Sequence, residues 1–377
     1  MHRTLTVLLL TASAVAAQGQ DVPFHQYDPP STLVVPENPV TRAKYPFIDV
    51  HNHQWQMPDQ DLSEVVAAMD ALNMAVMVNL SGRGFRREQD ENGAFRFGLN
   101  GSDFLQRAIA NAQRSAPGRF VVFTNVDLYG MDAPGWTENA VRQLEADVAA
   151  GAQGLKIYKS LGLELTDGTG RRVPVDDPRL DPIWARCGEL GIPVLIHSGE
   201  PASFWKPKDA DNERLLELIQ KPERYRDPAK VASWAQILGE QHNVFRRHPG
   251  TTFINAHLGW MGNDLARLGR LMDELPNMVT EIGAVLAELG RQPRFARQWF
   301  LRYQDRVLFG KDSWAPVEYH TYFRVLETSD EYFDYYRRRH AFWKMYGLNL
   351  PDEVLKKLYY KNALRIIPGI DPSGFPE

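Results

Sequence analysis

Short runs of apolar and β-branched residues recur along the chain at intervals that suit a repeating unit of strand and helix. Between most of them the apolar residues follow helical spacing, as at Val141, Leu144 and Val148. Uninterrupted apolar runs are typical of strands buried on both faces, as in a parallel sheet. Eight runs are predicted as strands: 47–50, 75–78, 120–123, 155–158, 194–196, 252–254, 278–280 and 307–309.

Eight alternating units of this kind predict a (β/α)₈ TIM barrel over residues 46–377, ending in C-terminal helices. A doubly wound sheet is the rival fold. It is disfavoured because the first strand ends in histidines, where a dinucleotide-binding fold needs glycines. Cys187 lies on the apolar face of its predicted helix and is interpreted as a core residue.

The first 45 residues are predicted to lie outside the barrel. Residues 1–17 combine a basic start, an apolar run and small residues, which is the pattern of a secretory signal peptide. A membrane anchor is disfavoured because the run is shorter than the ~20 residues of a spanning helix. Residues 18–45 are rich in proline and predict an extended arm. We therefore expect a secreted or periplasmic protein that is free of the membrane after signal cleavage.

Composition mainly excludes function classes. Lys+Arg 43 against Asp+Glu 47 gives a net charge of −4, which argues against a nucleic-acid partner. A hydrophobic content of 44% is enough for a large core. With one cysteine the chain has no internal disulfide, so stability rests on the core or on a bound metal. The expected partner is a small-molecule substrate. The outer helices of barrels often pair between subunits, so a homo-oligomer is possible and the sequence does not decide the oligomeric state.

Histidines and one aspartate stand at the ends of four predicted strands, where barrel enzymes build their active sites. Two of the histidines are two residues apart on one strand and so share a face. Imidazole and carboxylate together suit zinc or a related divalent ion. This pattern predicts a metal site from the strand-end residues His51, His53, His197, His257 and Asp312.

With these motifs the chain resembles the amidohydrolase superfamily, and within it the amidohydrolase-related branch that includes aminocarboxymuconate-semialdehyde decarboxylase. The resemblance spans roughly Tyr45 to Pro368. It rests on four strand-end motifs, residues 49–53, 196–199, 255–259 and 308–312, and on a closing helix, residues 352–366.

The resemblance implies a metal-dependent barrel with one divalent ion, zinc being favoured. The ion is surrounded by His51, His53, His197 and Asp312, and His257 lies beside it. The family often carries threonine where this chain has Lys311. That lysine is expected either to form a salt bridge at the rim or to enter the pocket.

The expected chemistry starts from the effect of a divalent ion on water, whose pKa it lowers toward neutrality. Asp312 is placed to contact the ion and to accept the proton of the water. Either His257 or the proton returned from Asp312 then protonates the leaving group. His257 could instead polarise a carbonyl or bind a second metal. Asp49 has two readings, an orienting partner of a ligand imidazole or a surface carboxylate.

Lys156 on the fourth strand leaves the number of metal ions open. Related barrels use a lysine at this strand, carboxylated by CO₂, to bridge two metals. A lysine that points into a barrel must be paired or modified, because a buried free ammonium is costly. In the decarboxylase-like branch this residue is not a ligand. One metal is therefore favoured, with Lys156 near the substrate or behind the ligands.

The segment 198–228 is too polar and proline-rich for one helix and is expected to form the pocket wall. Its candidate substrate contacts are Glu200, Trp205 and Lys206, and Arg83 is a candidate clamp for a substrate carboxylate. Residues 332–346 are predicted as an aromatic outer helix, and His242 and His248 as surface residues.

Three functions follow. The first is a hydrolase that cleaves an amide, ester or lactone bond with metal-activated water. The predicted export of the protein favours this function, because exported enzymes commonly process external material. The second is a metal-dependent non-oxidative decarboxylase, which the motifs do not separate from the first. The third is an inactive secreted barrel that only binds a ligand, which is disfavoured because every expected ligand residue is present.

Overall fold

The computed structural model describes residues 22–23, 26–89 and 95–377. The predicted signal peptide, residues 1–17, lies outside the described residues. The barrel lies within residues 34–377, which form one compact unit. Within the described ranges, no helix has the length and apolar character needed to cross a membrane.

All eight predicted strands are found, and they pair in parallel as in a TIM barrel. The third occurs as two segments, β5 and β6, that pair with different neighbours. The pairing orders are β1-β2-β5 and β6-β7-β8-β9-β10-β11. The bounds are β1 Phe47–Asn52, β2 Met74–Asn79, β5 Phe120–Val122, β6 Thr124–Asn125, β7 Leu155–Ile157, β8 Val194–Ile196, β9 Phe253–Asn255, β10 Met278–Glu281 and β11 Val307–Leu308.

Two connections complete the ring of strands. The amide of Phe123, between β5 and β6, donates to Asn79 O at 3.0 Å, and the next amide donates to Gly154 O at 2.8 Å. One strand therefore passes from pairing with β2 to pairing with β7. On the other side, Val50 N donates to Phe309 O at 2.9 Å and joins β1 to the end of β11. The eight strand ends consequently surround one axis.

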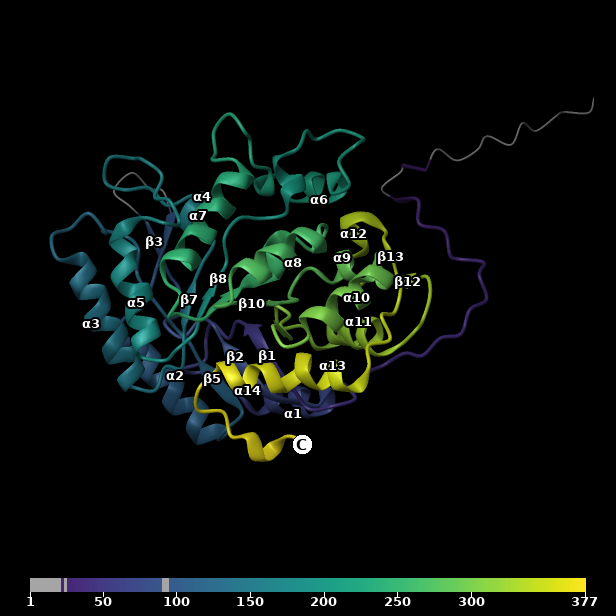
Figure 1. Cartoon of the computed structure of the whole chain (residues 1–377), viewed down its shortest axis with the longest axis horizontal. Coiled ribbons are helices and arrows are strands. Elements are labelled where there is room, and N and C mark those ends of the chain that lie inside the picture. The colour runs from purple at the N-terminus through teal and green to yellow at the C-terminus, as the bar shows by residue number, and fades with distance from the viewer. Residues whose placement is uncertain (1–21, 24–25, 90–94) are drawn as a thin grey trace, which may run out of the picture. The chain divides into compact units, whose positions relative to one another are not determined.

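Helices alternate with these strands, and α2, α3 and α5 lie outside β5, β7 and β8 in Figure 1. Cys187 is fully buried in α5, as predicted. The helices are α1 Ser63–Leu72, α2 Ser102–Ser115, α3 Trp136–Ala149, α4 Ser160–Leu163, α5 Asp181–Glu189, α6 Leu215–Gln220, α7 Trp234–Arg247, α8 Leu265–Glu274, α9 Leu286–Gly290, α10 Pro293–Tyr303, α11 Pro316–Glu327, α12 Arg338–Ala341, α13 Asp352–Lys356 and α14 Asn362–Ile366.

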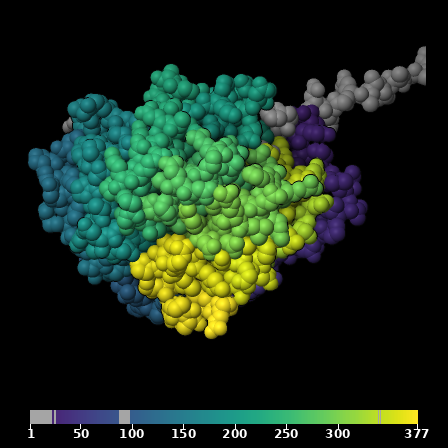
Figure 2. Space-filling model, in the orientation of Figure 1, coloured from purple at the N-terminus to yellow at the C-terminus, as the bar shows by residue number. Residues whose placement is uncertain are grey.

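The C-terminal helices are present where the closing helix is expected, with a π-helical turn, η6 (Lys357–Lys361), between α13 and α14. Phe309 N donates to Leu358 O at 3.0 Å, so this turn holds the end of β11. In the space-filling view these residues, in yellow, form the lower edge of this face of the barrel unit (Figure 2). The arm residue Asn38 donates from its backbone and side chain to Asp330 at 2.7 and 2.6 Å.

Two local predictions are wrong. Residues 332–346 do not form one helix but two short antiparallel strands, β12 (Phe333–Asp334) and β13 (Lys344–Met345), around α12. Tyr332 and Phe342 have φ values of 57° and 39°, which a right-handed helix excludes. His242 is only 8% exposed, because it continues the apolar stripe of α7 that contains Leu238 and Phe245. His248 is half-buried.

Candidate metal centre

The first strand places two histidines against the aspartate that follows the last strand. His51 Nε2 lies 3.4 Å from Asp312 Oδ1, and His53 Nε2 lies 3.7 Å from the same oxygen. Asp312 has a φ of 85° and donates its backbone amide to His51 O at 2.6 Å, which holds its carboxylate over β1. One ligand atom from each of the three side chains lies within 4.8 Å of the others.

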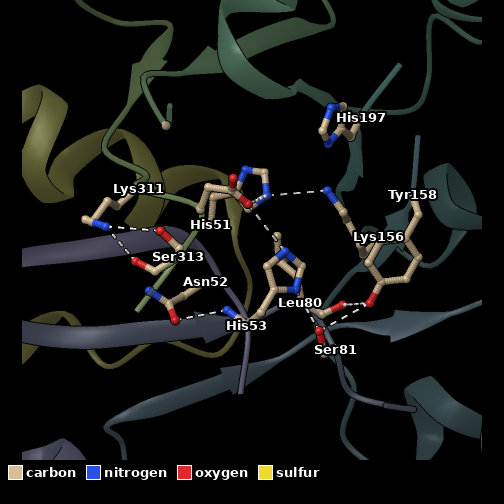
Figure 3. Close-up of polar contacts among 12 residues, drawn as sticks. His51, Asn52, His53, Leu80, Ser81, Lys156, Tyr158, His197, Lys311 and Ser313 are labelled. Carbon is tan, nitrogen blue, oxygen red and sulfur yellow. Dashed lines mark hydrogen bonds and ion pairs between the residues drawn. The ribbon is translucent and has the colours of Figure 1, made fainter. Parts of the chain in front are cut away.

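The other ring nitrogens of these histidines are held by neighbours. His53 Nδ1 lies 2.6 Å from Ser81 Oγ, and Tyr158 OH contacts the same hydroxyl at 3.2 Å (Figure 3). His51 Nδ1 lies 3.0 Å from Glu281 Oε1. Both histidines therefore present Nε2 toward Asp312, which is the arrangement a shared metal ion needs.

Glu281, at the end of β10, is a residue that the sequence reasoning missed. It is fully buried and accepts from His51 Nδ1, from the backbone amide of His257 at 2.6 Å and from that of Gly283. His51, His257 and Glu281 form a second possible metal group. Because Glu281 is already occupied by these donors, we interpret it as the carboxylate that orients His51. Its only sequence signal was its position at a strand end.

The segment after β9, η5 (Ala256–Trp260), is a left-handed turn. His257, Leu258, Gly259 and Trp260 have φ values of 58°, 53°, 57° and 53°. Such a run is strained for residues other than glycine and persists where the surroundings hold it. At Gly259 a Cβ would lie 2.4 Å from Asn255 Nδ2, so only glycine fits. The turn directs the rings of both His257 and Trp260 toward the metal centre.

His257 Nδ1 lies 2.8 Å from Gly283 O. Since a carbonyl oxygen only accepts, this nitrogen carries the proton and Nε2 has the lone pair. His257 Nε2 lies 3.3 Å from His197 Nδ1, which brings the fifth-strand histidine to the site. His197 Nε2 is buried and has no hydrogen-bond partner among the described residues. Of the four expected ligands, it is the one that lies outside the group formed by His51, His53 and Asp312.

Electrostatics keep these groups in the protonation states that bind metal. Burial lowers the pKa of His53 and His197 well below the usual range and that of His257 to about 4. Burial acts to raise the pKa of Asp312, but the adjacent His51, His257 and His53 outweigh it and hold that pKa below its usual range. Neutral imidazoles with an ionised carboxylate and an orphaned buried nitrogen fit a divalent ion.

Lys156 points into the barrel from β7 and lies beside the same centre. Its Nζ is 3.5 Å from His51 Nε2, as Figure 3 shows. The side chain is 1% exposed, and burial lowers the pKa of its amine to about 7. The position suits either of the two expected roles, a neighbour of the substrate or a modified ligand.

Asp49 and Lys311 are both buried, and neither is hydrogen-bonded to an imidazole ring among the described residues. Asp49 accepts from the backbone amide of His51 at 3.0 Å and from Tyr319 OH at 2.5 Å, so it holds the strand rather than an imidazole. Lys311 is directed away from the centre in Figure 3, where its ammonium donates to Ser313 O at 2.8 Å. It also pairs with Glu318, whose side chain is 30% exposed, so Lys311 forms a salt bridge and does not enter the pocket.

Three expected substrate contacts are engaged elsewhere. The Arg83 guanidinium donates to Asn100 O at 2.9 Å and to Asn125 O at 3.4 Å, so two backbone carbonyls hold it in place. Trp205 donates from Nε1 to Ala232 O at 2.9 Å. The carboxylate of Glu200 is buried and pairs with Lys159 and Arg226. Short loops can be located from sequence, but the direction of their side chains cannot.

An apolar cavity of about 360 Å³ adjoins the centre, and we call it the aromatic pocket. Trp55 stacks on His53 with ring centroids 4.7 Å apart, and Phe85 stacks on Trp55 at 4.8 Å. Lys156 and Tyr158 line the inner end. Trp55 is 42% exposed and Phe85 is 37% exposed, although both are large and apolar. The pocket suits a flat apolar group held beside the metal centre.

Comparisons with known proteins agree with this architecture. A family model described as Amidohydrolase matches residues 48–369. A 2,6-dihydroxybenzoate decarboxylase from Rhizobium has a TM-score of 0.51 and 15% identity, covering 85% of this chain and 98% of its own. A manganese-bound dihydroxybenzoic acid decarboxylase from Polaromonas has a TM-score of 0.50 and 14% identity, covering 85% and 96%. A zinc-bound amidohydrolase from Burkholderia multivorans has a TM-score of 0.47 and 14% identity, covering 85% of this chain and 98% of its own. Curated proteins gave no match.

Proposed function

Because this chain belongs to the amidohydrolase family of metal-dependent enzymes, we propose that it is a hydrolase that cleaves an amide, ester or lactone bond of a small organic molecule. One divalent ion, with zinc favoured, is held by His51, His53, His197 and Asp312. The observation that carries the proposal is the position of Asp312 Oδ1, 3.4 and 3.7 Å from the Nε2 atoms of His51 and His53. A carboxylate in this position would help to hold the ion and would be available to accept a proton beside it.

A divalent ion at this site supplies Lewis acidity and makes water acidic enough to react near neutral pH. The Asp312 carboxylate, which its lowered pKa keeps ionised, would be the group that accepts the proton of that water. The same proton then passes to the leaving group. His257 is the weaker candidate acid, because its Nδ1 proton is held by Gly283 O and its pKa of about 4 leaves Nε2 unprotonated at neutral pH.

A non-oxidative decarboxylase is the second candidate, and the aromatic pocket favours it. An aromatic acid packed against Trp55 and Tyr158 in this pocket would bring its carboxylate toward Lys156, which also lines it. The two decarboxylases of similar fold act on dihydroxybenzoates, by their names. A barrel that only binds a ligand is the third candidate and is disfavoured, because every expected ligand residue is present in the sequence.

We also propose that the enzyme acts outside the cytoplasm, since residues 1–17 have the pattern of a signal peptide. N-terminal sequencing of the mature protein tests this point. Cleavage near Ala17 supports export, and a mature chain that begins at Met1 rejects it.

The decisive experiment counts metal per chain and assays activity before and after chelation. Esters, lactones and amides are scored by acid release, and hydroxybenzoates by CO₂ release. Metal-dependent acid release without CO₂ supports the hydrolase. Metal-dependent CO₂ release establishes the decarboxylase instead. A protein that binds no metal after reloading contradicts both catalytic readings.

A further inference from the structure

A row of aromatic rings runs through the metal centre and meets a pocket at each end. Neighbouring ring centroids are 4.7 Å apart for Trp55 and His53, 5.5 Å for His53 and His51, 4.7 Å for His51 and His257, and 4.6 Å for His257 and Trp260. The aromatic pocket lies at the Trp55 end. A second and different pocket lies at the Trp260 end.

This second cavity, which we call the polar pocket, has a volume of about 50 Å³. Its walls come from the segments that follow β8, β9 and β10, so it opens on the same end of the barrel as the metal centre. The volume suits a group of a few heavy atoms. Its polar and charged lining residues are Ser203, Lys206, Glu213, Arg214, Asn263 and Glu288, and Trp260 completes the wall.

Two buried polar atoms in this wall have no hydrogen-bond partner within the described part of the chain. They are Nε1 of Trp260, a residue that is 9% exposed, and Oε2 of Glu288, which is 8% exposed. A buried donor or acceptor without a partner is costly, and proteins rarely leave one without a reason. The left-handed turn that positions His257 also fixes Trp260, so the indole is held in place at a cost in backbone strain.

The pocket lining carries both signs of charge, Lys206 and Arg214 against Glu213 and Glu288, and this balance favours an uncharged ligand. Arg214 is buried and donates to Glu217 Oε2 at 2.7 Å and to the other carboxylate oxygen of Glu288, so its charge is offset. A carboxylate in the pocket would face Glu288. An ammonium would face Arg214 and the N–H of Trp260. A hydroxyl or carboxamide both accepts and donates, and it complements the two unpartnered atoms.

We propose that the polar pocket is a second subsite of the active site, which binds an uncharged hydroxyl or carboxamide group of the substrate. Trp260 Nε1 donates to this group and Glu288 Oε2 accepts from it. The inference rests on the proposed hydrolase function for its account of the substrate. That substrate is an ester or amide with a flat apolar end in the aromatic pocket and an uncharged polar end in the polar pocket.

The test measures binding separately from turnover. Phenyl ketones mimic the esters, and CH₂ replaces the ester oxygen so that hydrolysis cannot occur. Each ketone carries a linear chain that ends in hydroxyl or in a methyl group of equal size, and the chain length is varied by one or two carbons. Titration calorimetry with the zinc-loaded protein is expected to show about tenfold tighter binding of the hydroxyl ketone at the best length. Carboxylate-ended and ammonium-ended ketones are expected to bind more weakly.

Trp260→Phe removes the indole N–H and is expected to abolish the preference for hydroxyl. Trp299→Phe is the matched control, because Trp299 Nε1 is also buried without a partner among the residues that the structure describes but lies on α10, away from the metal centre. Equal binding of hydroxyl and methyl ketones at every length, tighter binding of the carboxylate, or a preference that survives Trp260→Phe overturns the subsite. A hydroxyl preference without cleavage of the matching esters rejects hydrolysis and keeps the subsite.

Discussion

The carboxylate of Glu281 lies 3.0 Å from His51 Nδ1, and both side chains are fully buried. Burial acts to raise the pKa of Glu281, but the adjacent His51 and His257 outweigh it and hold the pKa at about 2. Glu281 is therefore an ionised acceptor, and His51 Nδ1 carries the proton. Since that leaves the lone pair on Nε2, Glu281→Gln is expected to weaken zinc binding by about 10-fold to 100-fold, measured by competition with a chelating dye.

Asp147→Asn is the control for this variant. Asp147 is a buried carboxylate that accepts from Ser102 Oγ at 3.0 Å and contacts Thr124, and it touches no histidine of the centre. Its variant is expected to change stability but not zinc affinity. Equal zinc affinity in Glu281→Gln and the wild type would show that Glu281 does not orient His51.

Asp312→Asn is expected to fold normally and to lose turnover. Asparagine has the same shape and tolerates the φ of 85° found at this position, so the backbone conformation is retained. The amide cannot accept the proton of water, which predicts a loss of about 100-fold or more in kcat. Circular dichroism and the metal content check that the fold and the ion are kept. Full activity in this variant would mean that another group accepts the proton.

We predict one metal ion per chain, and Lys156 is the residue that decides the question. Its amine has a pKa of about 7, so a large share is neutral near pH 7, and the neutral form is the one that reacts with CO₂. Elemental analysis of the wild type and of Lys156→Met, each reloaded with zinc and bicarbonate, is expected to give one ion in both. Two ions in the wild type and one in the variant would establish a carboxylated Lys156 as a bridging ligand.

The barrel and most of its centre could be predicted from sequence because both follow from local patterns. Each buried strand is a short apolar run, and parallel strands that close into a barrel bring their ends together. His51, His53 and Asp312 stand directly at such ends, so the topology alone places them side by side. The two strand-end histidines His197 and His257 meet for the same reason.

Other features depend on tertiary contacts that no local pattern encodes. Glu281 also ends a strand, but its role depends on facing His51, which is 230 residues away. Arg83 has the charge of a clamp, yet its guanidinium is held by backbone carbonyls that sequence does not locate. Trp260 reaches the centre through a left-handed turn, and only Gly259 hinted at that conformation.

His242 provides a pH test of the fold away from the metal centre. Burial, with Arg246 and Arg267 nearby, lowers its pKa from 6.5 to about 4. As pH falls below 6.5 the unfolded chain binds a proton at this histidine, whereas the folded chain binds it only near pH 4. The wild type therefore loses stability from this group between pH 6.5 and 4, by about 3 kcal/mol in total.

His242→Phe removes this titration and keeps a ring beside Phe245, whose centroid lies 6.4 Å from that of His242. Urea unfolding of the metal-free proteins is expected to give similar free energies at pH 7 to 8. Below pH 6.5 the variant should become progressively more stable than the wild type, because only the wild type still has this group to protonate on unfolding. A difference that stays constant from pH 8 to pH 4 would mean that His242 is accessible to protons in the folded protein.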